Sequence, residues 1–242
     1  MDYLAEAIQR LQAIRAEEGA AIEAAAQAIA GAIESGHLVY VFGATHASLL
    51  AQELFYRAGG LVPINPILPP ALSTAVRPIT QTTASEREPG LGTQLVAESP
   101  IAAGDVVIVH SVSGRNAAPV EFAQAARARG AYVIALTSLE YSRAVAPRQP
   151  GQPRLFEAAD LVLDNHAPVG DALVAVSGLA QRVGPVSTVT GAAILNAVVV
   201  RVAELLQAAT GDAPVFVSAN LDGGDARNQR WLDHYAGRLT YL

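Results

Sequence analysis

Short apolar runs alternate along this sequence with segments of helical periodicity, and this alternation restricts the possible folds more than any other feature. Four runs have the length of a β-strand, namely residues 38–42, 105–109, 132–136 and 161–164. Runs that are apolar at nearly every position are typical of strands covered on both faces. Because helical segments separate the runs, we predict an α/β fold with a parallel, doubly wound sheet and right-handed crossovers.

Helical patterns lie before, between and after these runs. Residues 1–35 are rich in alanine and carry larger apolar residues at helical spacing, and Gly19 is a point where this helix bends or divides. Further helices are predicted at 49–58, 90–98, 117–129 and 186–206. The proline-rich segment after the first of these predicts a short strand near 61–64 and then a long loop that includes the polar residues 80–88.

These elements suggest a division of the chain into three parts. Residues 1–35 form an N-terminal helical segment that packs on the domain or on a partner subunit. Residues 36–212 form the ligand-binding domain, and residues 213–242 form a C-terminal extension. The small alanine side chains of the first segment allow close helix–helix approach, and Trp231, Tyr235 and Tyr241 are expected to be packing anchors. We expect a homodimer or a dimer of dimers.

Two absences in the composition exclude several kinds of chemistry. All 16 basic residues are arginines, so no lysine is present to form a Schiff base or to serve a Walker A loop. No cysteine occurs either, which excludes disulfides, thiolate nucleophiles and cysteine-ligated metals. The net charge of −6, without any basic run, argues against a nucleic-acid or membrane partner. The aspartates lack metal-specific spacing, so we predict no metal site.

The location of the protein is predicted from two stretches. Residues 1–11 carry charged side chains where an export signal needs an uncharged apolar stretch. The longest apolar stretch, 190–209, is interrupted by Asn196, Arg201 and Glu204, and is therefore expected to be a buried helix rather than a membrane span. We expect a cytoplasmic protein.

Hydroxyl-bearing residues gather in the turns 43–48, 111–116 and 137–142, which follow predicted strands. Ligands of open parallel sheets bind at the carboxyl ends of the strands, beside the point where strand order reverses. Two of the turns precede helices, whose free amides attract anions. Without lysine, a phosphate would be held by amides, hydroxyls and Arg115. Alternatively, each serine or threonine simply caps a helix.

Three of these segments resemble the strand ends of the SIS (sugar isomerase) fold: VFGATHAS at 41–48, SVSGRN at 111–116 and VIALTS at 133–138. Runs 164–172, 184–188 and 218–225 are similar to a bacterial branch of that fold, so the resemblance extends over nearly the whole chain. It implies a five-stranded parallel sheet between helices and a site for a phosphorylated sugar, often shared between subunits. The turn 43–48 lacks the later glycines of a dinucleotide fingerprint, and no cofactor is expected.

The resemblance also implies roles for individual residues. The phosphosugar contacts would be Thr45, Ser48, Ser111, Ser113, Ser187 and Thr188. Glu53 matches the glutamate that acts as acid/base in phosphoheptose isomerases. Those enzymes also use a histidine on the last long helix, whereas residues 186–206 contain none and offer Asn196 as the nearest polar side chain.

Aldose–ketose isomerisation moves a proton between adjacent carbons, so it needs a base and a donor to the carbonyl oxygen. We predict a sugar-phosphate isomerase with Glu53 as base and His46 as assisting acid. His110 and His166 also follow predicted strands and could reach the site. The alternative for Glu53 is a pair with Arg57 one helical turn away. A phosphosugar lyase of the etherase kind and a non-catalytic phosphosugar sensor remain alternative functions.

Overall fold

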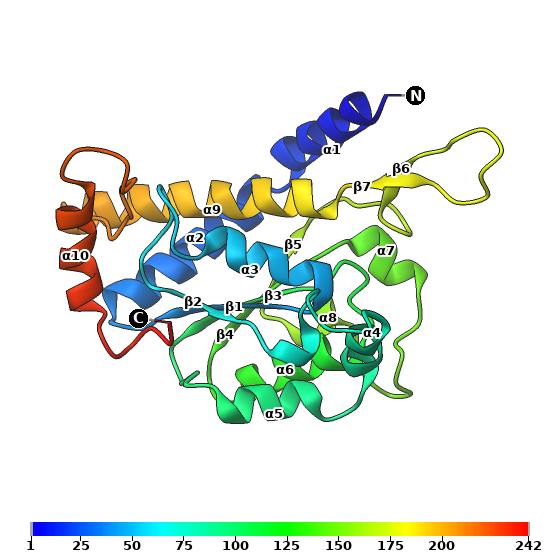
Figure 1. Cartoon of the computed structure of the whole chain (residues 1–242), viewed down its shortest axis with the longest axis horizontal. Coiled ribbons are helices and arrows are strands. Elements are labelled where there is room, and N and C mark those ends of the chain that lie inside the picture. The colour runs from blue at the N-terminus through cyan, green and yellow to red at the C-terminus, as the bar shows by residue number, and fades with distance from the viewer. Residues whose placement is uncertain (1, 242) are drawn as a thin grey trace.

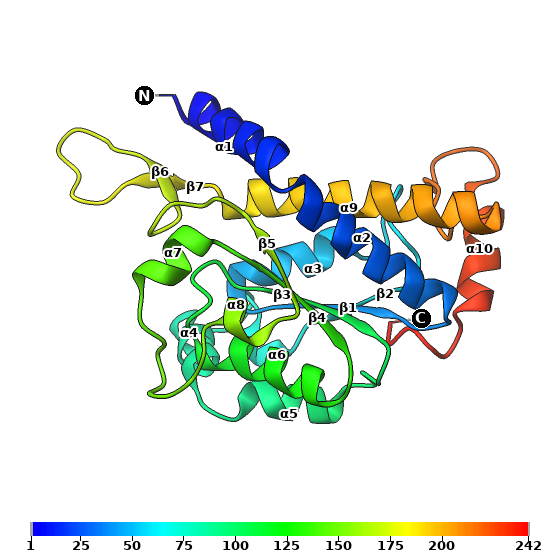
Figure 2. The ribbon, with the colours of Figure 1, turned by 180° about the vertical axis from the view of Figure 1, so that it is seen from behind.

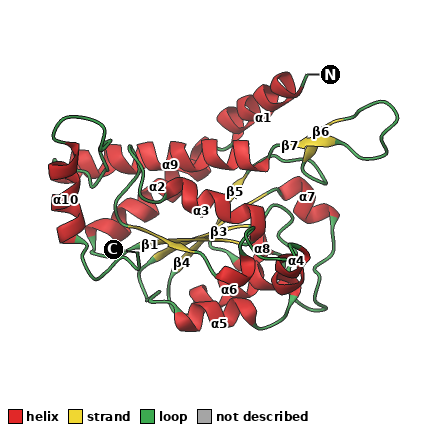
Figure 3. Cartoon of the chain, in the orientation of Figure 1, coloured by secondary structure: helices red, strands yellow, loops and turns green. Residues whose placement is uncertain are grey.

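The computed structural model describes residues 2–241, and its centre is a five-stranded sheet. All neighbouring strands of this sheet are parallel, in the order β2-β1-β3-β4-β5. The strands are β1 (Val39–Gly43), β2 (Ile64–Ile67), β3 (Val106–His110), β4 (Tyr132–Thr137) and β5 (Leu161–Asp164). The predicted doubly wound α/β fold is confirmed, and Figure 3 shows the strands enclosed between helices.

Helices cover both faces of the sheet. One face is covered by α2 (Gly19–Glu34), α3 (Ser48–Leu54) and α9 (Ser187–Thr210), and the other by α5 (Leu91–Glu98), α6 (Ala117–Ala128) and α8 (Leu155–Ala158). Alternate side chains of β1 face opposite layers, because Val41 joins the first cluster and Phe42 the second. Both are fully buried. This two-sided burial explains why the strand sequences are continuously apolar.

The N-terminal helix is divided as Gly19 predicts, into α1 (Tyr3–Glu17) and α2. Whereas α2 packs along α9, α1 extends away from the body together with the antiparallel hairpin of β6 (Ala172–Val174) and β7 (Val183–Pro185) (Figures 1 and 2). Tyr3 ties α1 to this hairpin by donating from its hydroxyl to the Pro185 carbonyl at 2.8 Å.

The segment after β1 differs from its prediction. The helix ends at Leu54 rather than at residue 58, and the strand lies at 64–67 rather than 61–64. Leu61 instead forms a bridge with Val215 of the C-terminal extension. Within the segment predicted as a long loop, residues Pro70–Leu72 form η2 and the polar residues Thr80–Arg87 form α4. The remaining helices are α7 (Leu139–Ala144) and α10 (Gly224–His234), neither of which was predicted.

The long apolar helix α9 is a core element. Of the described residues, only this helix is long and apolar enough to span a membrane. Ile194, Val198 and Val202, however, are buried in the cluster that packs against the sheet, and Arg201 on its outer side forms an ion pair with Glu23 of α2. The expectation of a core helix rather than a membrane span is therefore confirmed.

Candidate functional site

A cavity of about 210 Å³ lies at the carboxyl ends of β1 and β3, where the chain leaves these two strands towards opposite faces of the sheet. In the order β2-β1-β3, the turns that follow β1 and β3 diverge, and ligands of open sheets bind between such turns. The short helix η1 (Thr45–Ala47), the turn 111–113 and the start of α9 line the cavity. Asn116, α4, α7 and the segment before β6 complete its wall.

Six of the predicted site residues line this cavity: Thr45, His46, Ser111, Ser113, Ser187 and Thr188. The hydroxyls of Thr45, Ser111, Ser113 and Thr188 make no hydrogen bond with any other residue in the range 2–241. They come from three separate segments and remain available to a ligand. A helix-capping role therefore does not account for these four hydroxyls.

Two glycines allow the turns to take their shape. A Cβ on Gly43 would lie 2.5 Å from the backbone of Ala47, so only glycine lets η1 fold back against the end of β1. Gly114 has a φ of 57°, and a Cβ there would lie 2.7 Å from the Ser142 hydroxyl. Thr45, a β-branched residue, also has a positive φ of 57°. Such strained residues cluster at binding sites, and Thr45 lines the cavity.

The N-terminus of α9 already holds an anion of the protein itself. Asp171 accepts hydrogen bonds from the Ser187 amide at 2.8 Å, the Ser187 hydroxyl at 2.7 Å and the Val186 amide at 3.2 Å. Its φ of 67° lies in the left-handed region. The donors of Ser187 are therefore occupied, while the neighbouring Thr188 hydroxyl is not.

His110, the last residue of β3, is a neutral imidazole in the cavity wall. It is 1% exposed, and burial lowers its pKa to about 4, although the Ala47 carbonyl and Asp171 act in the opposite direction. Nδ1 lies 3.2 Å from that carbonyl oxygen, which accepts only, so Nδ1 carries the proton. The unprotonated Nε2 is buried without a partner among the described residues.

Glu86 on α4 also lines the cavity. Burial raises the pKa of its carboxyl, against the opposing effects of Asn116 and of nearby arginines. A carboxyl group with a raised pKa in a cavity is suited to proton transfer. Glu86 could not be identified from the sequence, because its segment was predicted to be a loop and no local motif marks the residue.

The other three predicted site residues lie outside this cavity. Ser48 donates to the Thr45 carbonyl at 2.7 Å and lines a neighbouring pocket. Glu53 pairs with Arg57, as the alternative reading proposed, and accepts a hydrogen bond from Asn196 at 3.2 Å. The Nε of Arg115 is buried with no partner in the described chain. Within residues 2–241, no group of three or more acidic or histidine side chains could hold a metal ion.

Comparisons with known proteins place this site in context. The model of the SIS domain matches residues 2–138. A UPF0309 protein of Shouchella clausii is 44% identical over 238 residues, covering 98% of this chain and 97% of that protein. The corresponding protein of Oceanobacillus iheyensis is 41% identical over 241 residues, with coverages of 100% and 98%.

Solved structures show the same fold. A phosphoheptose isomerase from Francisella tularensis is 19% identical, covers 83% of this chain and 94% of its own, and superimposes with a TM-score of 0.53. A phosphoheptose isomerase from Neisseria gonorrhoeae is 18% identical with the same coverages and TM-score. At identities of 18–19%, the similarity to these structures shows a shared fold and no more.

Proposed function

Because this chain belongs to the SIS domain family, we propose that it binds a phosphorylated sugar in the cavity between the ends of β1 and β3. One observation carries the proposal. Four hydroxyls from three separate segments, those of Thr45, Ser111, Ser113 and Thr188, line one cavity without partners among the described residues. Converging neutral donors are suited to the oxygens of a phosphate group and of a sugar.

The phosphate is held by neutral donors near the start of α6. No arginine in the described chain lines the cavity, so hydroxyls and amides must supply the hydrogen bonds to the phosphate. The side chain of Asn116, the N-cap residue of α6, does not cap that helix. The first amides of α6 are therefore available beside Ser111 and Ser113, where the helix dipole also favours negative charge. The Glu86 and Asp171 carboxylates repel phosphate, so the sugar rather than the phosphate lies on their side of the cavity.

Isomerisation is the reaction that these groups support best. A base removes the proton from the carbon next to the carbonyl, an enediol forms, and the proton returns to the former carbonyl carbon. Glu86, whose carboxyl pKa is raised by burial, is the base in this proposal, and His46 is the assisting acid that donates a proton to the carbonyl oxygen. Glu53, the base predicted from the sequence, stays the alternative, although it does not line the cavity.

Ligand binding tests the first part of the proposal. Isothermal titration of the whole chain with pentose, hexose and heptose phosphates is expected to identify a ligand. Ser113→Ala should weaken its binding about tenfold, because a charge-assisted hydrogen bond to phosphate is lost. Ser99→Ala, which removes a hydroxyl bonded to the Val96 carbonyl elsewhere, is the matched control. Equal affinity of all three proteins would refute the phosphate site.

Turnover distinguishes an isomerase from a sensor. Product formation from the bound ligand is followed by NMR for the unmodified chain and for two matched variants, Glu86→Gln and Glu53→Gln. We expect Glu86→Gln to lower turnover at least ~100-fold while binding persists. Loss of activity in Glu53→Gln alone would assign the base to Glu53. Binding without any product would favour the sensor, and cleavage into two products would favour the lyase.

A further inference from the structure

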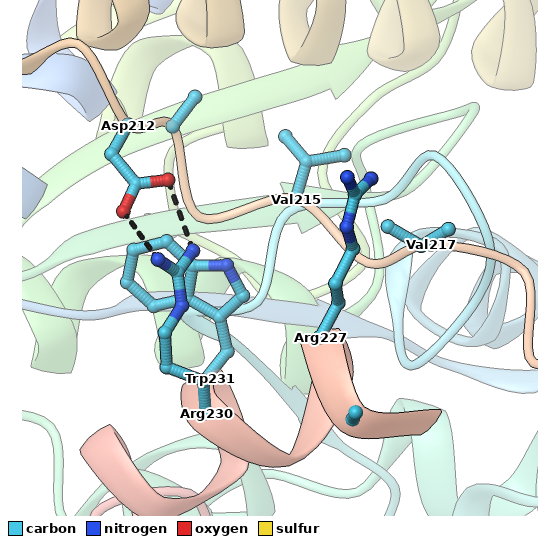
Figure 4. Close-up of a pocket in the computed structure, with 8 residues that line it drawn as sticks. Asp212, Val215, Val217, Arg227, Arg230 and Trp231 are labelled. Atoms are coloured by element: carbon cyan, nitrogen blue, oxygen red, sulfur yellow. Dashed lines mark hydrogen bonds and ion pairs between the residues drawn. The ribbon is translucent and has the colours of Figure 1, made fainter. Parts of the chain in front are cut away.

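A second cavity, of about 550 Å³, lies at the opposite end of α9 from the proposed sugar-phosphate site. Its walls are the residues that follow α9, from Asp212 to Val217, and one side of α10 (Figure 4). The volume falls within the range of about 300–1,000 Å³ that is typical of small-molecule sites. No ligand was predicted for this region from the sequence.

The walls of this cavity are fixed before any ligand binds. The side-chain amide of Asn228 on α10 makes two hydrogen bonds with the backbone of Val217. Its Nδ2 donates to the Val217 carbonyl at 2.8 Å, and its Oδ1 accepts from the Val217 amide at 2.9 Å. The bridge between Leu61 and Val215 joins the same wall to the main domain. A preformed wall spares the ligand much of the cost of ordering its own site.

Arg230 presents a flat cationic surface in this cavity. Its two terminal nitrogens contact the two oxygens of Asp212 at 2.9 and 3.0 Å, which uses the edge of the guanidinium group. One face lies over the Trp231 ring, 4.6 Å from its centroid. The side chain is nevertheless 60% exposed. The opposite face is therefore available for stacking with a planar group, as guanidinium groups commonly do.

Arg227 supplies an unneutralised charge beside this surface. Its guanidinium group extends across the cavity near Val215 and Val217 (Figure 4) and forms no ion pair or hydrogen bond with the rest of the described chain. With Asp212 paired to Arg230, the cavity carries one net positive charge on a protein whose net charge is −6. This local sign favours an anionic ligand over a neutral one.

We propose that this cavity binds an aromatic anion. The planar ring of the ligand stacks on the exposed face of the Arg230 guanidinium group. The ligand's carboxylate or phosphate group accepts two hydrogen bonds from Arg227 in a bidentate contact. Val215 and Val217 cover the apolar edge of the ring. The requirement for a ring and a charge together separates this site from the sugar-phosphate cavity, which lacks any arginine among its described lining residues.

The only tryptophan of the chain, Trp231, makes the proposal directly testable. Biosynthetic incorporation of 5-fluorotryptophan into the full chain gives a single ¹⁹F resonance that reports this cavity. The probes are AMP as an aromatic phosphate and 2-naphthoate as an aromatic carboxylate, with adenosine and inorganic phosphate as ligands that lack one of the two features. We expect AMP, 2-naphthoate or both to shift the resonance saturably, and at lower concentrations than either incomplete ligand.

Matched arginine variants identify the anchor. Arg227→Gln should weaken the binding of the effective probe about tenfold, because the charge-assisted contact is lost. Arg15→Gln, which removes an exposed arginine of α1, should leave binding unchanged. Both positions are exposed, so neither variant is expected to unfold the chain. The proposal is overturned if neither aromatic anion shifts the resonance saturably, or if Arg227→Gln binds the probe as well as the unmodified chain.

Discussion

Asp171 occupies a position at the site where the sequence predicted a contact with the ligand. Ser187 was predicted to contact the ligand from the family resemblance, and its position at the start of a long helix also suits an anion. In the folded chain the Asp171 carboxylate, brought in by the turn before β6, takes up both donors of Ser187. Asp171, sixteen positions before Ser187 in the sequence, thus occupies two donors that the family resemblance assigned to the ligand.

Replacing this carboxylate should change stability and affinity in opposite directions. Asp171→Asn keeps an oxygen that can accept from the Ser187 amide but removes the charge at the helix N-terminus, so we expect a loss of about 1 kcal/mol in the free energy of unfolding. The affinity for the sugar phosphate should rise about fivefold, because a negative charge that repels the phosphate leaves the cavity. Denaturant unfolding and isothermal titration measure the two effects.

The matched control for this variant is Asp160→Asn. Asp160 also accepts a hydrogen bond from a backbone amide, that of Val133, but it lies at the amino ends of the strands, whereas the cavity lies at their carboxyl ends. This variant should lose stability without any gain in phosphate affinity. A fall in affinity for Asp171→Asn would instead show that the carboxylate contacts the ligand directly.

His110 should make the stability of the fold depend on pH. Its folded-state pKa of about 4 lies below the ordinary value of 6.5, so the unfolded chain binds more protons between these two pH values. The free energy of unfolding therefore falls as the pH drops through that window, by about 2 kcal/mol from this group between pH 7 and pH 5. Urea unfolding of the unmodified chain and of His110→Gln at both pH values isolates the contribution. Equal losses in the two proteins would contradict a buried neutral imidazole.

At the scale of elements, the strands were predictable and α4 was not. A strand buried on both faces must be apolar at nearly every position, and β1, β3 and β4 show this pattern. The edge strand β5 is also apolar at most positions, although it is only partly buried. In α4 only Thr82 is fully buried, and Ser85 and Glu86 are partly buried. This helix has no apolar stripe that would mark it in the sequence. Its position depends on contacts with η2 and α6, which no local pattern encodes. Glu86 could not be placed in the cavity for the same reason.

The contact between α5 and α6 should respond sharply to one methyl group. A Cβ on Gly92 would lie 2.2 Å from the Ala118 carbonyl oxygen and 2.6 Å from the Phe122 amide nitrogen, both of them backbone atoms of α6. Gly92→Ala must therefore push the two helices apart, and we expect a loss of about 2 kcal/mol in the free energy of unfolding. Guanidinium unfolding of the purified chain measures it.

Gly31→Ala is the matched control for this substitution. Gly31 lies inside α2, is exposed, and a Cβ there would meet nothing within 4 Å. The added methyl group should stabilise the chain by about 0.5–1 kcal/mol, because alanine has the higher helix propensity. If both variants lost stability equally, the close approach of α5 and α6 would not be the cause.

At the scale of the whole molecule, the sheet order explains why four of the six predicted residues in the cavity, those in the turns after β1 and β3, meet. Apolar patterning identifies the strands, and in a doubly wound sheet their carboxyl ends lie along one edge. The turns carrying Thr45, Ser111 and Ser113 therefore had to be neighbours. Glu53 is different, because its position depends on where the side chain points from α3, and there it faces Arg57 and Asn196. Backbone topology was accessible from the sequence, whereas side-chain direction was not.

The apolar surface of α1 leads to a prediction about assembly. Leu4 and Ile8, one helical turn apart, are 67% and 52% exposed on a helix that extends from the body beside the hairpin. Val176 and Leu179 in the loop of that hairpin are also exposed. Exposed apolar groups of this kind mark interaction sites, and we predict that a second copy of the chain covers them, as the alanine-rich sequence suggests.

Sedimentation analysis of the whole chain tests this assembly. We expect a dimer or a larger even-numbered oligomer whose melting temperature rises with protein concentration, since association stabilises the folded state. A double substitution, Leu4→Asp with Ile8→Asp, should give monomers and abolish the concentration dependence, because two charges cannot be buried in an apolar interface without partners. Leu221→Asp, at a position that is 61% exposed near α10, should leave the assembly intact. A monomeric unmodified chain, or an oligomer that withstands the double substitution, would show that α1 has another role.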